Sequence, residues 1–195
     1  MPDATFRSGE RARVDESTLI ARSRTGDLQA YDRLVGAYQD RIYNAAFRIT
    51  GNREDAWDAA QDAFIRGYQG LRSFRGEAGF GTWLHRIAVN AALDIVRRRP
   101  RAPQELDPML AAPDDPAGDV LRRDVQRRVH RAIAALPPDQ RTAVVLRDIQ
   151  GFSYEEIARV MQVPVGTVRS RLARAREGLR VRLADLSRTV FEEDA

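Results

Sequence analysis

The stretch SYEEIARVMQVPVGTVRSRLARAREGLR, residues 153–180, decides the fold of the second half of this chain. Ser153, followed three residues later by Glu156, forms a capping box, a pattern that begins a helix. After a tight turn, Pro164 is a typical residue at a helix start and predicts a second helix from Val165 to about Leu183. The stretch therefore predicts a helix–turn–helix.

The second of these helices has two different faces when it is projected at 3.6 residues per turn. A narrow apolar stripe predicts its buried side: Val168, Leu172, Ala175 and Leu179. The opposite side is rich in arginine and small residues: Arg169, Ala173, Arg176 and Arg180, flanked by Ser170 and Arg174. Small residues allow close approach to base edges, and arginine contacts phosphate or guanine. A solvated basic helix would show the same face, but the capping box, turn and proline favour DNA binding.

The first half of the chain also reads as helical. One amphipathic stripe, with steps of three and four, consists of Tyr31, Leu34, Val35, Tyr38, Ile42 and Ala46. Gly51-Asn52 ends this helix, and a second one is expected over residues 53–70. A glycine-rich break at 74–81 precedes a third helix, residues 82–99, with one apolar face: Leu84, Ile87, Ala88, Ala91 and Ile95. No alternating pattern predicts a strand, so the fold class is all-α.

Five prolines and interspersed acids between residues 100 and 118 predict a flexible acidic linker between two small helical domains. The expected organisation is a disordered N-terminus (1–16), a first domain (17–99), the linker (100–120), a second domain (121–185) with the helix–turn–helix, and an acidic tail (186–195).

Composition limits the possible functions. The 195 residues include no cysteine, which excludes disulfides, thiolate zinc sites and cysteine nucleophiles and fits a reducing cytoplasm. The two histidines, His85 and His130, are too far apart in sequence for a convincing metal site, and no cofactor is expected. No apolar run is long enough to span a bilayer, and the N-terminus lacks the apolar core of a signal peptide. Residues 121–182 carry 14 arginines against six acids, which indicates a polyanion partner.

Four patches in order carry a family resemblance. They are Gly26-Asp27 with Ala30-Tyr31, Leu34, Tyr38, Ile42-Tyr43 and Arg48; Glu54-Asp55-Ala56 with Asp58, Gln61-Asp62 and Phe64; Phe74-Arg75-Gly76 with Thr82-Trp83-Leu84, Arg86-Ile87-Ala88, Asn90, Asp94 and Arg97-Arg98; and Gly151 with Ser153-Tyr154, Glu156-Ile157-Ala158 and Val165 to Arg171. The chain resembles sigma-70 family RNA polymerase sigma factors. A proline-rich linker stands in place of the intermediate domain, as in the extracytoplasmic-function (RpoE-like) subfamily.

The resemblance implies three sets of site residues. The first set would bind core RNA polymerase by docking on the clamp helices of its β′ subunit; the β subunit is also an implied partner. These polymerase-binding residues are Asp55, Asp58, Gln61, Asp62 and Phe64. The −10 set is Phe74, Arg75, Gly76, Phe80, Thr82, Trp83, Arg86, Asn90, Arg97 and Arg98. The −35 set is Gly166, Thr167, Arg169, Ser170, Arg171, Ala173, Arg174 and Arg176. Trp57, Ala59 and Ala173 depart from the usual pattern at the docking and −35 positions.

The function implied by the resemblance is promoter-specific initiation by core RNA polymerase, with promoter DNA and an anti-sigma factor as further partners, and with no membrane insertion and no catalytic residue. Steps of three and four place Asp55, Asp58 and Asp62 on one helix face, which suits a basic partner helix. A solvated face and a two-metal carboxylate cluster are the alternatives, although the second lacks further ligands.

The glycine-rich break is expected to trap one unstacked base with the help of Asn90. Asn90 could equally be a helix-surface amide, and Trp83 a core residue rather than a stacking platform. Arg97 and Arg98 could complement the helix dipole or contact phosphates. Two rival functions remain: an ordinary helix–turn–helix regulator with a helical sensor domain, which would bind duplex without polymerase, and a metal-dependent nucleic-acid enzyme.

Overall fold

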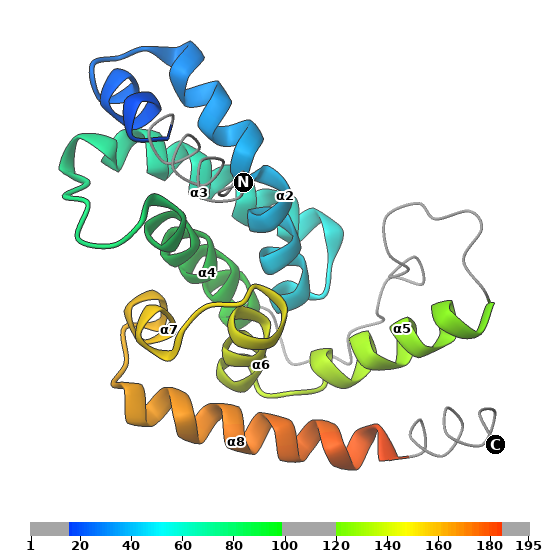
Figure 1. Ribbon diagram of the computed structural model, residues 1–195. Coiled ribbons are helices and arrows are strands. Elements are labelled where there is room, and N and C mark those ends of the chain that lie inside the picture. Colours follow the sequence, from blue (N-terminus) through cyan, green and yellow to red (C-terminus); the bar gives the residue numbers. More distant parts are fainter. Residues whose placement is uncertain (1–15, 99–119, 185–195) are drawn as a thin grey trace, which may run out of the picture.

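The computed structural model describes residues 16–98 and 120–184, and within these ranges every regular element is helical (Figure 1). The first helical unit contains a helix over 16–24, α2 (Leu28–Thr50), α3 (Arg53–Gly70), the short turn η1 (Leu71–Ser73) and α4 (Phe80–Arg98). The second helical unit contains α5 (Val120–Ala134), α6 (Pro138–Val144), the π-helical turn η2 (Val145–Ile149), α7 (Tyr154–Met161) and α8 (Val165–Arg182). The all-α prediction is confirmed.

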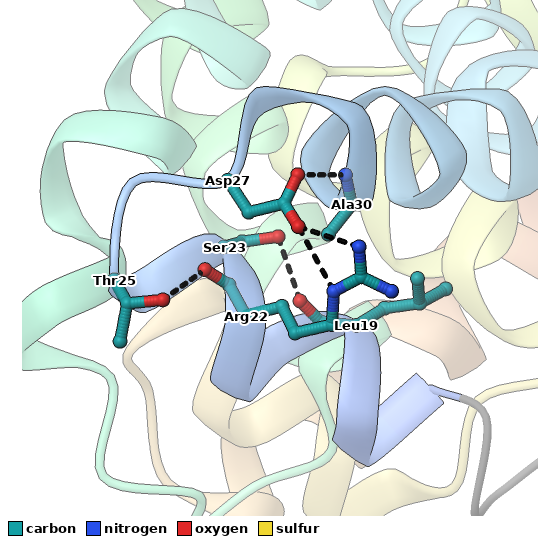
Figure 2. Close-up of polar contacts among 6 residues, drawn as sticks. All are labelled: Leu19, Arg22, Ser23, Thr25, Asp27 and Ala30. Carbon is teal, nitrogen blue, oxygen red and sulfur yellow. Dashed lines mark hydrogen bonds and ion pairs between the residues drawn. The ribbon is translucent and has the colours of Figure 1, made fainter.

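A network of polar contacts fixes the turn into α2 (Figure 2). The Oδ1 atom of Asp27 accepts a hydrogen bond from the Ala30 backbone N–H at 3.0 Å, and Oδ2 accepts one from Arg22 Nε at 2.9 Å. These bonds favour the ionised carboxylate, so they hold the pKa of Asp27 below its ordinary value. At the other end, Gly51 has φ of 72° and ends α2 where the sequence predicts.

Three boundaries differ from the sequence-based expectation. Glu16, expected in the N-terminal tail, is helical, and its carboxylate accepts a 2.6 Å hydrogen bond from Tyr38 Oη. Helix α4 begins at Phe80 rather than Thr82, because Phe80 is buried and fixes the end of the glycine-rich break. Val120, assigned to the linker, is the first residue of α5. The predictions for 1–15, 99–119 and the acidic tail lie outside the described residues.

The two helical units pack against each other, with α6 and α7 beside α4 (Figure 1). One apolar cluster contains buried side chains from both units. The first contributes Ala46, Ile49, Ala56, Ala59, Val89, Ala91, Ala92 and Leu93, and the second contributes residues that include Leu136, Val144, Leu146, Ile157 and Val160. Helix α4 is therefore buried on a second face beside the predicted one. The sequence predicts two domains but does not reveal this contact.

Arg141 of α6 joins the two units by hydrogen bonds. It is only 6% exposed, and its guanidinium donates to the carbonyls of Ile49 at 2.6 Å, Leu136 at 3.2 Å and Ala134. The last carbonyls of a helix have no partner within that helix. Arg141 therefore caps the ends of α2 and α5 at once, and its burial lowers its pKa below the ordinary value.

Both histidines lie at the contact between the units, although the sequence gives them no special role. His85 of α4 is 2% exposed, its Nδ1 donates to the Gly81 carbonyl at 2.8 Å, and its ring lies 4.8 Å from that of Phe152. Its Nε2 has no hydrogen-bond partner among the described residues. His130 Nε2 lies 2.7 Å from the Arg48 guanidinium and accepts, because arginine can only donate.

The stability of the fold is expected to depend on pH through His85. Burial lowers the pKa of His85 below 6.5, Arg41 of α2 adds to this, and the hydrogen bond to Gly81 opposes it. On the α7 side, Glu156 bonds Thr82 one turn before His85. Because the folded state favours the neutral ring, this contribution to stability is complete above pH 6.5 and is lost as the pH falls below that value.

Urea unfolding at about pH 7.5 and about pH 5.5 measures this effect. The wild-type chain should lose more stability on acidification than the His85→Phe variant, which keeps an aromatic ring but cannot titrate. The carboxylates and His130 are common to both chains, so the difference between their losses of stability isolates the effect of His85. An equal loss in the two chains would show that protonation of His85 does not weaken the fold.

Candidate nucleic-acid interface

A pocket of about 360 Å³ opens where the glycine-rich break meets the start of α4. Its lining residues are Ser73, Phe74, Arg75, Gly76, Glu77, Ala78, Thr82, Trp83, Arg86 and Arg159. Six of the predicted −10 residues are therefore brought together around one pocket. Arg159, which comes from α7 in the second helical unit, was not predicted.

Aromatic rings form and support the pocket wall. The rings of Phe74 and Trp83, both half-buried, lie 5.1 Å apart, and each is within 6 Å of the Phe80 ring, at 5.8 and 5.7 Å. Phe80 itself is only 2% exposed, so it supports the wall from beneath. Trp83 both packs on the core and lines the pocket, so its two sequence-based interpretations are compatible. The pocket offers aromatic surface beside arginine side chains.

The glycines of the break serve different purposes. Gly76 has φ of 75°, a conformation that other residues rarely adopt, and it sits in the pocket wall. Gly81 has no such φ, but a Cβ there would lie 2.8 Å from Tyr38 Cε1. Glycine at this position therefore lets the start of α4 approach α2.

Besides Phe80, three predicted −10 residues lie outside the pocket lining, farther along α4. Asn90, Arg97 and Arg98 are exposed, and Arg97 forms a weak ion pair with Asp94 at 3.9 Å. The two arginines occupy the last turn, where cations complement the helix dipole. The structure thus separates the pocket at the start of α4 from the basic end of the same helix.

Helix α3 carries the predicted polymerase-binding residues. Asp58 and Gln61 are exposed, and Asp62 is paired with Arg66 at 2.8 Å. Asp55 is half-buried next to the N-cap, where its backbone N–H donates to the Asn52 side chain at 3.0 Å. Asp58 and Gln61 are therefore the most accessible of the five.

Phe64, the fifth predicted residue, packs against the core of the first helical unit, and its carbonyl accepts a 2.6 Å hydrogen bond from Tyr31 Oη. Trp57 is 65% exposed with its ring 5.3 Å from that of Tyr43, so an aromatic surface adjoins the acidic one. Among the residues that the structure describes, no three histidines, cysteines or carboxylates are placed to hold a metal ion.

The helix–turn–helix forms as predicted. Ser153 Oγ accepts from the Glu156 backbone N–H at 3.2 Å, and Ser153 N–H donates to Glu156 Oε2 at 2.9 Å, which confirms the capping box and lowers the pKa of Glu156. The predicted stripe of α8 is also confirmed, since Val168, Leu172 and Ala175 are at most 2% exposed.

On the opposite side of α8, some of the predicted −35 residues are exposed, and others already form hydrogen bonds or ion pairs within the chain. Gly166, Arg169, Ala173 and Arg174 are exposed, and neither arginine forms an ion pair with another described residue. Three others are already bonded: Arg171 to Asp139 at 2.6 Å, Arg176 to Asp148 at 2.7 Å, and Ser170 to the carbonyl of the half-buried Thr167 at 2.9 Å.

Sequence reasoning misses Arg141 and Arg159 because Ile49, which Arg141 bonds, and the pocket residues that face Arg159 are distant in the chain. The only available signal for Arg141 is its place beside the apolar run from Ala143 to Leu146.

Within the described residues, no helix is both long and apolar enough to cross a membrane.

The folded units match one known family. Residues 34–102 match Sigma-70 region 2, and residues 126–179 match Sigma-70, region 4. This chain belongs to the sigma-70 family of RNA polymerase sigma factors.

Similar proteins indicate the subfamily to which the chain belongs. It is 42% identical over 185 residues to the RNA polymerase sigma-H factor of Pseudomonas aeruginosa, covering 89% of this chain and 96% of the relative. Identity with the ECF RNA polymerase sigma-E factor of Escherichia coli is 38% over 178 residues, covering 85% and 93%.

Two solved structures have a fold similar to that of this chain. The structure of CnrH in complex with the cytosolic domain of CnrY is 26% identical with a TM-score of 0.68, covering 88% of this chain and 98% of that one. The Bartonella quintana sigma factor RpoE, crystallised with the anti-sigma factor NepR, is 25% identical with a TM-score of 0.66, covering 79% and 96%. The chain is thus an alternative sigma factor of the extracytoplasmic-function group, which directs promoter-specific transcription with RNA polymerase.

Proposed function

We propose that the first helical unit docks on core polymerase through α3 and captures a non-template base near −10, while α8 enters the −35 major groove. No covalent catalysis is involved. The observation that supports this best is the pocket at the start of α4, because six residues of the −10 set line it.

The pocket suits an unstacked base. Phe74 and Trp83 supply aromatic surface on which a base can stack, and Arg75 and Arg86 can neutralise the flanking phosphates. Opening a duplex costs about 1.4 kcal/mol per base-pair step, so ten steps cost on the order of 14 kcal/mol. A single pocket cannot supply that energy. The proposed task of the pocket is therefore to hold one flipped base while the polymerase keeps the strands apart.

In the proposed −35 complex, Arg169, Ala173 and Arg174 face the DNA, since these residues are exposed on α8. Arg171 and Arg176 serve first to hold α8 against α6 and η2 through Asp139 and Asp148. Gly166 offers its backbone N–H to a phosphate at the helix N-terminus, next to Thr167, whose own N–H already donates to the Pro164 carbonyl at 2.9 Å.

In the proposed polymerase complex, the exposed residues Asp58 and Gln61 make the main contacts with the basic clamp helices of β′. Asp62 and Asp55, which are less exposed, make secondary contacts. Phe64 packs against the core and so positions α3. The chain acts in the cytoplasm. An anti-sigma factor is a further proposed partner, because the similar CnrH and RpoE structures contain partner proteins. The functional domains are proposed to span residues 17–99 and 121–185.

In vitro transcription tests this proposal. Core RNA polymerase and host genomic DNA are incubated with and without the purified chain, and RNA 5′ ends are sequenced. We expect new, sharply placed start sites that share two upstream elements. Duplex binding without any new start would instead indicate an ordinary helix–turn–helix regulator.

A further inference from the structure

Two large apolar side chains are exposed on α3, the helix that carries the proposed polymerase-binding residues. Trp57 is 65% exposed and Ile65 is 51% exposed, whereas Phe64 and Tyr68 of the same helix are half-buried. Apolar surface is unfavourable in water, and large apolar side chains gathered on one exposed face mark a contact with a partner. The exposure of Trp57 and Ile65 therefore calls for a partner that covers them.

Helix geometry places both side chains beside the residues that are proposed to make the main contacts with polymerase. Trp57, Gln61 and Ile65 follow one another at steps of four along α3, and Asp58 lies two turns before Ile65. These four residues share one side of the helix and form the α3 face. An apolar stripe thus runs through the α3 face next to its acidic row.

Two further aromatic rings hold Trp57 in place. Its ring lies 5.3 Å from that of Tyr43 on α2, and the Tyr43 ring stacks on Phe47 at 5.9 Å with only 5° between the ring planes. Tyr43 and Phe47 are half-buried and pack against the apolar core. The indole is therefore supported on one side and open to a partner on the other, and it loses little side-chain freedom on binding.

The charges around these side chains indicate the chemistry of the partner. The α3 face is flanked by Glu54, which is exposed, and by Asp62, whose ion pair with Arg66 is partly exposed. Negative charge here repels the phosphates of nucleic acids and of anionic membranes. A basic protein surface with an apolar centre fits instead. The basic clamp helices of core polymerase meet this requirement, because the apolar stripe is continuous with Asp58 and Gln61.

We propose that Trp57, supported by Tyr43 and accompanied by Ile65, is the apolar anchor of the contact with core polymerase and makes that contact resistant to salt. This inference rests on the proposed docking of α3 on β′. The acids attract and orient the basic clamp helices, but salt screens their attraction. Burial of the indole is not screened, and tryptophan is enriched among the residues that dominate interfaces. Trp57 is thus a determinant of how firmly this chain holds polymerase.

The first test is titration of labelled core polymerase with the full chain at about 0.1 M and about 0.5 M NaCl. We expect Trp57→Ala to weaken binding by about thirtyfold at both salt concentrations, and Trp57→Phe, which keeps an aromatic ring, by less than about fivefold. The loss caused by Asp58→Arg should instead shrink at the higher concentration. A loss below about threefold for Trp57→Ala, or one that disappears at about 0.5 M NaCl, contradicts the apolar anchor.

Leu28→Ala is the matched control. Leu28 is 62% exposed in the same helical unit, about 22 Å from Tyr43 along α2 at about 1.5 Å per residue. Its loss removes a similarly exposed apolar side chain outside the α3 face, so this variant should bind polymerase as the wild type does. Circular dichroism melting checks that each variant is folded, as expected for substitutions at exposed positions.

The second test identifies the surface that covers Trp57. The photoreactive residue p-benzoylphenylalanine, introduced in place of Trp57 or of Leu28, crosslinks on irradiation to the protein that it touches. Mass spectrometry should find crosslinks from the first position to the clamp helices of β′, and none from the second. Crosslinks to another subunit or to a second copy of the chain would overturn the proposal.

The two proposals fail in different ways. Weaker polymerase binding by Asp58→Arg, with wild-type binding by Trp57→Ala, leaves the proposed docking intact and removes only the apolar anchor. Wild-type binding by both variants removes the proposed docking of α3 itself.

Discussion

Substituting Arg141 with alanine is expected to lower the free energy of unfolding by about 4 kcal/mol, because two buried carbonyls and one half-buried carbonyl lose their hydrogen-bond donor and each unpaired buried group costs about 1–3 kcal/mol. These carbonyls belong to Ile49, Ala134 and Leu136, at the ends of α2 and α5 and in the turn before α6. Loss of these bonds therefore affects both helical units.

Urea unfolding followed by circular dichroism measures this loss. Arg141→Lys should be nearly as unstable as the alanine variant, since an ammonium group cannot reproduce the planar fork that reaches the carbonyls of both units. Arg131→Ala, which removes an exposed arginine from α5, should stay within about 0.5 kcal/mol of the wild type. A loss below about 1 kcal/mol for Arg141→Ala would contradict the bridging role.

Replacing Asp58 with arginine is expected to weaken binding to core RNA polymerase by about a hundredfold or more. Asp58 is exposed on α3, on the face proposed to meet the basic clamp helices, and placing like charges together across an interface costs several kcal/mol. Promoter-dependent transcription should fall in parallel at limiting concentrations of the chain. Titration of labelled core polymerase measures the affinity.

Asp40→Arg is the matched control, because Asp40 is an exposed aspartate on α2, outside the proposed docking set, and its reversal changes the net charge equally. It should bind core polymerase within about threefold of the wild type, since a charge outside the contact acts only through a screened field. Equal weakening by the two variants would mean that net charge, rather than the α3 face, governs docking.

Local patterns predicted the helix–turn–helix well. The Ser153–Glu156 capping box and the stripe of Val168, Leu172 and Ala175 were confirmed almost residue by residue. These features involve neighbours within one or two helical turns, so their physical cause is contained in a short stretch of sequence. The end of α2 at Gly51 was equally predictable, because a left-handed residue there closes the helix locally.

The candidate site was only partly predictable. The sequence placed Phe74, Arg75, Phe80 and Trp83 in one segment, but the pocket also has Arg159 across it. Helical periodicity indicates which side of a helix is apolar. It does not indicate which distant helix supplies the opposite wall.

The sequence by itself determined an all-α chain, its helix–turn–helix, its glycine-rich break and its resemblance to sigma factors, because caps, turns and helical periodicity act between near neighbours. Only the tertiary structure decided that the two units share an apolar cluster, that α4 is buried on a second face, and that Arg141 and His85 lie at the junction. The physical reason is that alanines such as Ala56, Ala59 and Ala92 suit an exposed or a buried helix face equally well. Their burial, like that of Arg141, depends on partners that only packing brings together.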